Sequence, residues 1–416
     1  MTETLVSRVA NLDVLTAAWH QVRSNGLASK SQNTRQAVRD FEVSVESRLA
    51  EISEQIASEV FDFGPAKGVL IPRPGKEPRP LLVASLPARI VQRALLDVLQ
   101  ACEGVRELSI SSTSFGGVPG GSVSRAIRAA CEAIASGKVY HLRSDIAGFF
   151  TRIPRSRVIE LVNDVLPDQS LNSLLDSATN LEISNREELG EYEALMPDEY
   201  EGIAQGCCLS PLLGNILLHQ FDSEMNSDTA TTLRYIDDFL ILGPDRVTVL
   251  ATAKAGDEIL KDLGMCAYSP TSSPGKASAG PTRRGIEFLG CWITDRVVEP
   301  SRSARRAFLS RVETEIRHAR VGLKHAAHGN YERSLVSTLL KVSRMIEGWT
   351  KQYSFCNPTK AFESVDVKTD RYVRGYLDAF FSAYRKGRAS MRTRRRLLGV
   401  WLASDAERVP ILPLDR

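Results

Sequence analysis

Residues 231–242 read TTLRYIDDFLIL, a strongly apolar run that is interrupted by two adjacent acids, Asp237 and Asp238. Burying two carboxylates among such residues is costly unless they are paired or bind a metal. Because neighbouring side chains on a strand point to opposite faces, both acids can approach one site only at a tight turn. The run therefore predicts a hairpin with Asp237 and Asp238 at its tip. An ordinary acidic hairpin turn is the alternative as long as the motif is considered alone.

A third acid lies near the end of another strand-like run upstream. Residues 139–146 are short, apolar and suited to a sheet, Asp145 comes near their end, and Phe149 and Phe150 follow. Two buried strands that deliver carboxylates to one place would form a metal site. Nucleotidyl transfer needs carboxylates that clamp two Mg²⁺ ions roughly 3.5–4 Å apart, one at the attacking 3′ oxygen and one at the leaving pyrophosphate. Three acids from two strands can build that clamp.

The charge is distributed unevenly along the 416 residues, whose formal net charge is only +3. Residues 301–416 contain 24 lysines and arginines against 11 aspartates and glutamates, which leaves residues 1–300 net negative. This excess predicts that the C-terminal quarter contacts a polyanion, with nucleic acid as the first candidate and a solvated helical face as the alternative. Residues 164–201 hold eleven acids and one base, Arg186. We expect that acidic segment to lie away from nucleic acid or to contact a basic part of its own protein.

The composition excludes several classes of protein. With 43% hydrophobic and 25% charged residues, the chain fits two or three ordinary globular domains and not a disordered or fibrous protein. The seven cysteines form no Cys-x-x-Cys pair, which favours a reducing compartment. The first residues lack the pattern of a secretory leader, and no run of about 18 apolar residues occurs. We therefore expect a cytoplasmic protein with no membrane partner.

Hydrophobic periodicity predicts the elements around these motifs. Residues 63–82 favour two short strands joined by a basic turn, and residues 88–99 favour a helix. A further helix is expected over residues 211–221 and a last strand over residues 286–293. Beyond residue 300 the period is helical throughout, which indicates a bundle of about three helices.

The motifs follow the order found in reverse transcriptases, and residues 69–349 resemble the bacterial class that includes group II intron, retron and defence-associated enzymes. The matching segments are IPRPGKEPRPLL with ARIVQRAL, SFGGVPGGS, DIAGFF, IAQGCCLSPLLGNILL, YIDD, FLGC and IEGWTKQYSF. The resemblance implies an α/β fold, a right-hand polymerase with fingers, an α+β palm and a helical thumb. The implied division is an N-terminal helical extension at 1–60, fingers at 61–140, a palm at 141–300 that includes the acidic segment 164–201, a basic thumb at 301–396 and a C-terminal tail at 397–416.

Residue roles are implied by position in the matching motifs. Asp145, Asp237 and Asp238 would be catalytic and would hold two Mg²⁺ ions, with Mn²⁺ as an alternative, and Ile146 would also lie at the metal site. The nucleotide-binding residues implied are Lys76, Arg79, Phe149, Phe150, Gln205, Tyr235 and Lys276. The residues implied to contact template or primer are Gly206, Ser210, Asn215, Phe288, Leu289, Gly290, Arg394, Arg395 and Arg396.

The resemblance implies an RNA-directed DNA polymerase, a nucleotidyltransferase that copies a structured noncoding RNA into DNA from dNTPs. The sequence lacks the additional motifs typical of retron enzymes and the nuclease tail typical of mobile intron enzymes. These differences favour a compact, standalone enzyme of antiphage defence. Two alternatives stay open: a maturase-like protein that binds a folded group II intron RNA, and a template-independent or protein-primed DNA polymerase.

Overall fold

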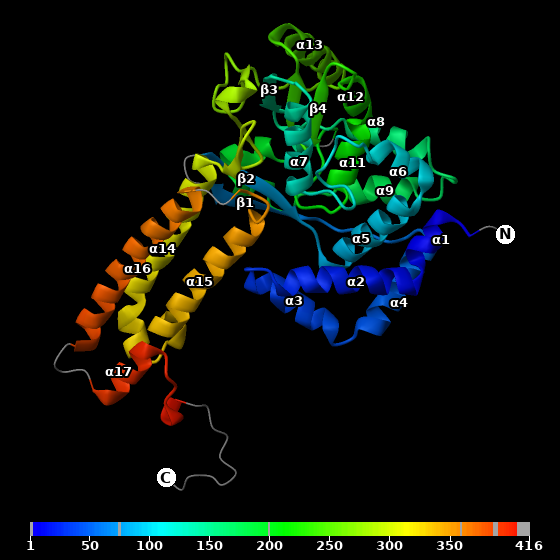
Figure 1. The fold of residues 1–416 in the computed structure, drawn as a ribbon. Helices are drawn as coiled ribbons and strands as arrows, with labels where there is room; N and C mark the ends of the chain where they lie inside the picture. The colour runs from blue at the N-terminus through cyan, green and yellow to red at the C-terminus, as the bar shows by residue number, and fades with distance from the viewer. Residues whose placement is uncertain (1–2, 74–75, 199, 358–359, 386–389, 406–416) are drawn as a thin grey trace. The chain divides into compact units, whose positions relative to one another are not determined.

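The computed structural model describes residues 3–73, 76–198, 200–357, 360–385 and 390–405, and at Lys76 only the backbone. The chain divides into two compact units, residues 1–282 (unit 1) and residues 283–416 (unit 2), which are described separately (Figure 1). Unit 1 combines helices with a four-stranded sheet and a hairpin, and unit 2 combines a three-stranded sheet with long helices. Residues 283–300 therefore belong to the same compact unit as the helices that follow them.

Unit 1 begins with helices that pack into one core. The first four are α1 (Leu5–Ala10), α2 (Leu12–Leu27), α3 (Gln32–Glu42) and α4 (Val45–Ala57). Their buried faces share a core with α5 (Leu86–Ala101), which contains the helix expected over residues 88–99. The Trp19 and Phe41 rings, for example, lie 4.7 Å apart inside it. Farther along unit 1 come α6 (Glu103–Ser109), α7 (Val123–Ala135), α8 (Arg155–Asn163), α9 (Asn172–Thr179) and α10 (Arg186–Leu189).

The expected N-terminal hairpin is confirmed. Strands β1 (Lys67–Arg73) and β2 (Lys76–Val83) pair antiparallel. The acidic segment 164–201 packs against the base of this hairpin: the Ala66 N–H donates to the Glu182 carbonyl (2.7 Å), and the Asn185 side chain accepts from the Gly68 N–H (2.8 Å). Farther along that segment, the Asp198 carbonyl accepts from the Arg155 guanidinium (2.6 Å). The acidic segment therefore contacts its own protein, including one buried base.

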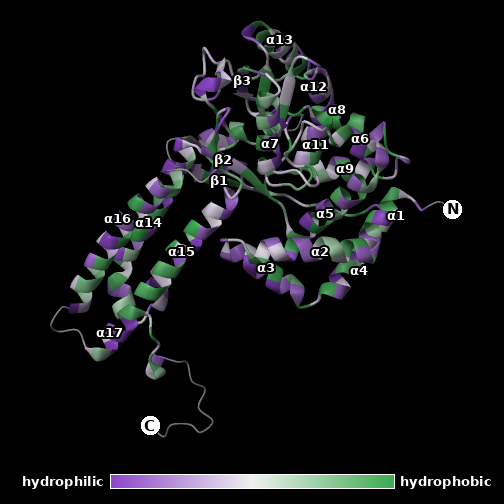
Figure 2. Cartoon of the chain, in the orientation of Figure 1, coloured by the Kyte–Doolittle hydropathy of each residue, from purple (hydrophilic) through white to green (hydrophobic). Residues whose placement is uncertain are grey.

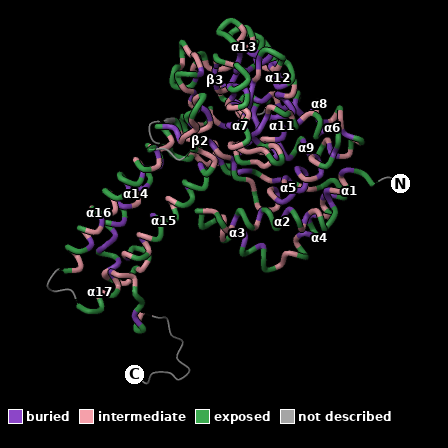
Figure 3. The backbone as a smooth tube through the Cα atoms, in the orientation of Figure 1, coloured by how far each residue is buried: buried purple, intermediate pink, exposed green. Residues whose placement is uncertain are grey.

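The sheet of unit 1 has the strand order β4-β5-β3-β6, with antiparallel neighbours throughout. The strands are β3 (Tyr140–Asp145), β4 (Thr231–Tyr235), β5 (Asp238–Gly243) and β6 (Ser278–Pro281), and α7 and α13 (Arg246–Asp262) contact the sheet. The single helix expected over residues 211–221 is instead two helices, α11 (Ser210–Leu217) and α12 (His219–Glu224), separated at Leu218. Figure 3 shows buried residues along α11. Strands β4 and β5 are also buried along most of their length.

Unit 2 corrects one expectation and confirms another. The single strand expected over residues 286–293 is wrong, because β7 (Ile286–Phe288) and β8 (Cys291–Ile293) form a hairpin whose turn residues Leu289 and Gly290 have φ of 48° and 77°. Leucine is not typical of a two-residue hairpin turn, so Leu289 did not indicate a turn in the sequence. Strand β9 (Val298–Pro300) completes the small sheet. The expected helical bundle consists of α14 (Arg302–Ala327), α15 (Leu335–Gln352), α16 (Lys360–Arg385) and α17 (Met391–Leu398).

Figure 2 shows hydrophobic and hydrophilic residues mixed along each long helix of unit 2. The apolar residues form an internal core, in which the Phe308 ring of α14 stacks on Trp349 of α15 at 4.7 Å. None of the helices in the described ranges combines the length and the apolar character that a membrane span requires.

Candidate active site

The three predicted acids meet at one edge of the unit 1 sheet. Asp145 closes β3, Asp238 opens β5 directly opposite it, and Asp237 lies in the turn between β4 and β5. The Ile146 N–H donates to the Asp237 carbonyl at 3.0 Å, which ties the two chain segments together beside the acids. The hairpin predicted from the interrupted apolar run is confirmed.

A strained turn brings Asp237 and Asp238 to the same place. Tyr235 pairs with Asp238, so Ile236 and Asp237 form a two-residue connection. Ile236 has φ of +63°, in the left-handed region that a β-branched residue rarely adopts. This turn breaks the alternation of a regular strand, and both acids line one cavity as a result.

Burial and mutual repulsion weaken these acids. Burial, followed by the charges of Asp145 and Asp238, raises the pKa of Asp237 to about 7. Burial and the charge of Asp145 raise the pKa of Asp238 to about 6, although Arg143 and Lys276 act in the opposite direction. The cluster therefore carries more negative charge than the surrounding protein neutralises.

Two cations face the cluster. The Lys276 Nζ lies 3.1 Å from the Asp145 Oδ2, and it lies 5.1 Å from the centre of the Tyr268 ring. Burial opposes the charge on Lys276, but the hydrogen bond and charge of Asp145 outweigh burial and raise the pKa of Lys276. The Arg143 Nη2 lies 3.7 Å from the Asp238 Oδ1. The structure thus places Lys276 beside the acids, as the resemblance implied, and its role stays a prediction.

A cavity of about 430 Å³ opens over the acids. Its polar lining combines carboxylates with cations and an amide, and its apolar lining is mainly aromatic. The lining residues include Arg73, Arg79, Asp145, Ile146, Phe149, Phe150, Gln205, Tyr235, Asp237, Asp238, Tyr268 and Lys276. Most of the predicted catalytic and nucleotide-binding residues are therefore brought together in one cavity.

The β1–β2 hairpin brings cationic residues to this cavity. The Arg79 Nε donates to the Gln205 Oε1 at 3.2 Å, and the Leu82 N–H donates to the Gln205 carbonyl at 3.0 Å. These contacts join the hairpin to the loop before α11. Arg73 also lines the cavity, although it was not among the expected nucleotide ligands. Lys76 opens β2, and its side chain lies outside the described part of the chain.

The two aromatic residues after β3 have different surroundings. Phe149 is only 3% exposed, and a Cβ added at Gly214 would lie 2.8 Å from its ring, so Phe149 packs mainly into the core against α11. Phe150 is half-buried and lines the cavity. The Phe150 carbonyl accepts from the Ile203 N–H at 2.8 Å, which fixes the backbone at this point. Phe150 is therefore the more accessible of the two rings to a bound nucleotide.

Residues 71–293, more than half of the chain, match the family described as "Reverse transcriptase (RNA-dependent DNA polymerase)". The chain belongs to the reverse transcriptase family. The resemblance inferred from the ordered motifs is confirmed, and so is the expected mixed α and β fold, since the match covers both the hairpin and the sheet that carries the three acids.

Curated relatives of this reverse transcriptase include two intron proteins from yeasts. An uncharacterized 91 kDa protein in the cob intron of Schizosaccharomyces pombe is 30% identical over 174 residues, 42% of this chain and 20% of that protein. A putative COX1/OXI3 intron 2 protein of Saccharomyces cerevisiae is 26% identical, over 54% of this chain and 25% of that protein. Protein YkfC of Escherichia coli is 27% identical, over 48% of this chain and 52% of that protein. The chain thus spans between about a fifth and about half of the length of these relatives.

Solved structures similar to this reverse transcriptase are more distant. A telomerase from Candida albicans in complex with a fragment of telomeric RNA is 11% identical, with a TM-score of 0.41 over 82% of this chain and 65% of that chain. A Cas6-RT-Cas1–Cas2 complex is 15% identical, with a TM-score of 0.39 over 90% of this chain and 50% of that chain.

Reverse transcriptases use divalent metal ions, and the donor set of the cluster fits such ions. Asp145, Asp237 and Asp238 offer carboxylate oxygens, the hard ligands that Mg²⁺ prefers, and the raised pKa values of Asp237 and Asp238 mark a need for added positive charge. Among the described residues, no three His, Cys, Asp or Glu side chains already form a metal-ligand group. Lys276 and Arg143 neutralise part of the charge instead. Ile146 is buried and lines the same cavity.

Three residues that the reverse transcriptase motifs assigned to template or primer contact the protein itself. The buried Ser210 hydroxyl donates to the Ala204 carbonyl at 2.7 Å, and the buried Asn215 amide donates to the Gly116 carbonyl at 3.0 Å. Gly206 has φ of +106°, which favours glycine, and an added Cβ would lie 3.3 Å from the Leu82 carbonyl oxygen. Their contact with a template stays a prediction.

The remaining predicted residues of this reverse transcriptase lie in unit 2. Phe288 is buried, and Leu289 and Gly290 form the β7–β8 turn. Of the α17 arginines, Arg396 pairs with Asp405 (Nε to Oδ2, 2.8 Å), and Arg395 donates to the Trp401 carbonyl at 2.8 Å. The Arg394 guanidinium lies 5.7 Å from the centre of the Tyr384 ring. All three arginines therefore make contacts within unit 2.

Several residues around the site of this reverse transcriptase were not predicted from the sequence. Arg143 could have been found, because it precedes Asp145 by two positions and so shares its face of β3. Tyr268 gives no signal of its own, since it lies in an irregular loop. Arg234 is a cation within a buried strand, and it pairs with Asp222 of α12. An unexplained charge in an apolar run is a signal for such a pair, but the sequence does not identify the partner.

Proposed function

We propose that this protein is an RNA-directed DNA polymerase that copies a structured noncoding RNA into DNA. The observation that carries the proposal is the convergence of Asp145, Asp237 and Asp238 in one cavity, faced by cationic side chains. The family matched by residues 71–293 is described by this activity. A merely structural acid cluster would be fully paired, whereas Asp237 and Asp238 have raised pKa values and an open cavity lies above the three carboxyls.

The proposed reaction joins a 3′ hydroxyl to the α-phosphorus of a dNTP. The 3′ hydroxyl would lose its proton to water as the new O–P bond forms, the bond from that phosphorus to the bridging oxygen would break, and pyrophosphate would leave with the electron pair. When bound, two Mg²⁺ ions, or Mn²⁺ in their place, would stabilise the attacking oxygen and the leaving pyrophosphate. Asp145, Asp237 and Asp238 would hold those ions through their carboxylate oxygens.

The other residues of the cavity would position the nucleotide. Arg79, fixed by Gln205, and Lys76 would neutralise the triphosphate, and Arg73 adds a third cation to the same hairpin. Phe150 would pack under the sugar and exclude a 2′ hydroxyl, and Tyr235 would lie near the primer end. Lys276 would supply a proton to the departing pyrophosphate, since its amine is charged and held beside Asp145.

Unit 2 would act as the thumb and bind the template–primer duplex through its phosphates. Its basic excess supports this role, and so does a cavity of about 460 Å³ between α14 and α16. That cavity is lined by five cationic residues and one acid, Glu313; the cations are Arg302, Arg305, Arg306, Lys368 and Arg371. Arg394, Arg395 and Arg396 stay proposed contacts, although Arg396 would have to share its pairing with Asp405.

A second candidate function is that of a maturase-like protein that binds an intron RNA. The names of two relatives favour it, since both proteins are assigned to introns. We also propose a role in antiphage defence and a cytoplasmic location. Both rest on the sequence alone. Phage plating on cells that carry the locus, with and without Asp237→Asn/Asp238→Asn, tests the defence role: protection should require both aspartates.

The enzymatic proposal is tested with the full chain purified from its native locus. Its nucleic acid would be sequenced and then extended with labelled dNTPs, in wild type and in Asp237→Asn/Asp238→Asn. We expect a defined RNA and a complementary DNA made by wild type alone. RNA binding without DNA synthesis in either protein would support the maturase-like function. A DNA product covalently attached to protein would instead indicate protein priming.

A further inference from the structure

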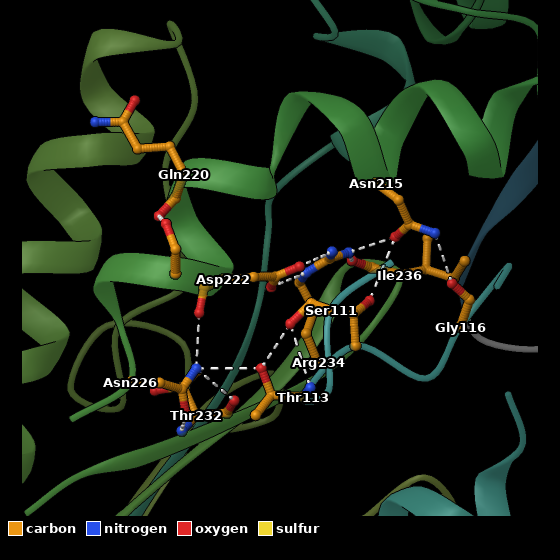
Figure 4. A network of polar contacts seen from close by, with 12 residues as sticks. Ser111, Thr113, Gly116, Asn215, Gln220, Asp222, Asn226, Thr232, Arg234 and Ile236 are labelled. Carbon is orange, nitrogen blue, oxygen red and sulfur yellow. Dashed lines mark hydrogen bonds and ion pairs between the residues drawn. The ribbon is translucent and has the colours of Figure 1, made fainter. Parts of the chain in front are cut away.

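A buried network surrounds Arg234, the residue before Tyr235 in the catalytic motif. Arg234 is fully buried, and its Nε donates to the Asp222 Oδ1 at 2.6 Å while Nη2 pairs with the other oxygen of that carboxylate. Its Nη1 donates to the Asn215 Oδ1 and to the Ile236 carbonyl, both at 2.9 Å (Figure 4). One guanidinium therefore connects α11 and α12 with the β4–β5 turn.

The network extends to the glycine-rich turn that precedes α7. The Asn215 amide donates to the Gly116 carbonyl at 3.0 Å, and the Phe115 N–H donates to the Arg234 carbonyl at 2.9 Å. A Cβ added at Gly116 would lie 2.6 Å from the Ile236 nitrogen, so only glycine fits against the turn there. The glycine-rich turn, α11, α12 and the β4–β5 turn are thus held by one set of contacts.

The carbonyl that Arg234 holds belongs to the peptide bond between Ile236 and Asp237. Ile236 has φ of +63°, a conformation that is strained for a β-branched residue, so this turn needs support from its surroundings. A charged donor on the carbonyl oxygen is a strong contact, and it fixes the plane of the peptide that leads into Asp237. Pairing with Asp222 makes a buried guanidinium tolerable at this point.

We propose that Arg234 is a positioning residue for Asp237. It holds the strained turn in the one conformation that places the Asp237 carboxyl with Asp145 and Asp238, and Asp222 and Asn215 hold Arg234 in turn. This inference rests on the proposed polymerase function for its kinetic test. Arg234 is buried, so it acts on the reaction only through the turn.

Arg155 offers a matched control. It is also a buried arginine of unit 1, and its guanidinium donates to main-chain carbonyls, at 3.0 Å to Gly202 and at 2.6 Å to Asp198. These carbonyls lie outside the β4–β5 turn. Arg155→Lys and Arg234→Lys therefore make the same chemical change at two buried sites, of which only one holds the catalytic turn.

The first test measures single-turnover nucleotide addition by the full chain at saturating dNTP. The rate constant does not depend on the fraction of folded enzyme, whereas the amplitude does. We expect Arg234→Lys to lower the rate constant at least 10-fold with a KM for dNTP within about 3-fold of wild type. Arg155→Lys should change the amplitude alone. A wild-type rate constant in Arg234→Lys would overturn the proposal.

A second variant guards against loss of the fold. Arg234→Met/Asp222→Leu replaces the ion pair with apolar groups of similar size, a change that often preserves stability. We expect this variant to stay folded and to show the same loss of rate constant, because the donor to the Ile236 carbonyl is gone. A folded double variant with the wild-type rate constant would contradict the proposal.

A third measurement separates this inference from the proposed function. Mn²⁺ binding to wild type, Arg234→Lys and Arg155→Lys would be followed by electron paramagnetic resonance without nucleic acid. Weaker Mn²⁺ binding in Arg234→Lys alone would support the positioning role, whether or not wild type extends a primer. Failure of wild type to extend a primer would contradict only the polymerase proposal. Equal Mn²⁺ binding in all three proteins would count against positioning.

Discussion

Two charged clusters lie at the β4–β5 turn. The charges of one cluster neutralise each other, whereas those of the other are neutralised only in part. Asp222 and Arg234 form a closed pair in which the carboxylate and the guanidinium satisfy each other. Asp145, Asp237 and Asp238 repel one another, and two of them have a raised pKa. The two nearby cations neutralise only part of this negative charge. The Lys276 Nζ contacts one oxygen of Asp145, and the Arg143 Nη2 lies 3.7 Å from the Asp238 Oδ1.

The difference distinguishes a structural cluster from a chemical one. A closed pair stabilises one conformation, because losing either partner leaves an unpaired buried charge. An under-neutralised cluster weakens the fold but leaves oxygen atoms free to bind cations from solution. The same residue types, a few positions apart, therefore serve as a rigid support and as a reactive site.

The largest expected effect comes from removing charge at the acid cluster. Asp237→Asn/Asp238→Asn should lower single-turnover nucleotide addition by roughly 10³-fold or more, because two of the three proposed carboxylate ligands of the catalytic ions lose their charge. Rapid-quench measurement of labelled dNTP incorporation would show the loss, and circular dichroism would confirm the fold. Addition within 10-fold of wild type would show that these acids are not the metal ligands.

Breaking the closed pair of Asp222 and Arg234 should lower the stability of the fold. Asp222→Asn leaves the Arg234 charge buried without a partner, and we expect the free energy of unfolding to fall by about 3–5 kcal/mol. Urea denaturation measures this loss. The exposed pair of Arg157 and Glu160 provides the control, since Glu160→Gln should cost less than about 1 kcal/mol. Equal losses in the two variants would contradict the distinction.

His141 of β3 adds a third kind of buried titratable group to the comparison of the two clusters, because burial keeps this residue neutral. Burial lowers the pKa of His141 to about 4, against a weaker opposite effect of its hydrogen bond to the Gly280 backbone. The unfolded chain therefore binds a proton that the folded chain does not between about pH 6.5 and pH 4, and stability falls as pH decreases through that range. We expect His141→Gln to remove about 3 kcal/mol of this loss. Urea denaturation of both proteins at pH 7 and pH 4 would measure it, and parallel pH profiles would refute the prediction.

The smallest of these effects concerns Lys276, the partial neutraliser of the acid cluster. Lys276→Gln should lower the single-turnover rate by about 10²-fold, because the proposed proton donor to pyrophosphate is lost. Lys261→Gln on the exposed end of α13 is the control and should leave the rate unchanged. An increase in the KM for dNTP with an unchanged rate constant would assign Lys276 to nucleotide binding and not to proton transfer.

The acid cluster could be predicted from the sequence because its signals are local. Asp237 and Asp238 interrupt an apolar run, and Asp145 ends another, so the cost of burial marks all three. The place of Lys276 came from the order of family motifs and not from its own irregular loop. Leu289 concealed the β7–β8 turn, since leucine is not a turn residue.

The closed pair could not be predicted, because it depends on tertiary packing. Asp222 lies in the polar stretch HQFDSE of α12, where an acid is ordinarily exposed, and Arg234 is adjacent to the motif that drew attention. Twelve residues separate them, and no helical or strand period relates the two positions. Their pairing appears only when α12 packs beside β4.

One comparison tests the central claim most directly: the free energies of unfolding of Asp237→Asn and Asp222→Asn, measured with wild type in a metal chelator at pH 8. Because the folded-state pKa of Asp237 is about 7 and lies above the usual value, its ionisation destabilises the fold as pH rises, and this cost is complete above that pKa. We predict that Asp237→Asn is more stable than wild type, on the order of 2 kcal/mol after solvent screening, and that Asp222→Asn is less stable. Changes of the same sign in both variants would contradict the account.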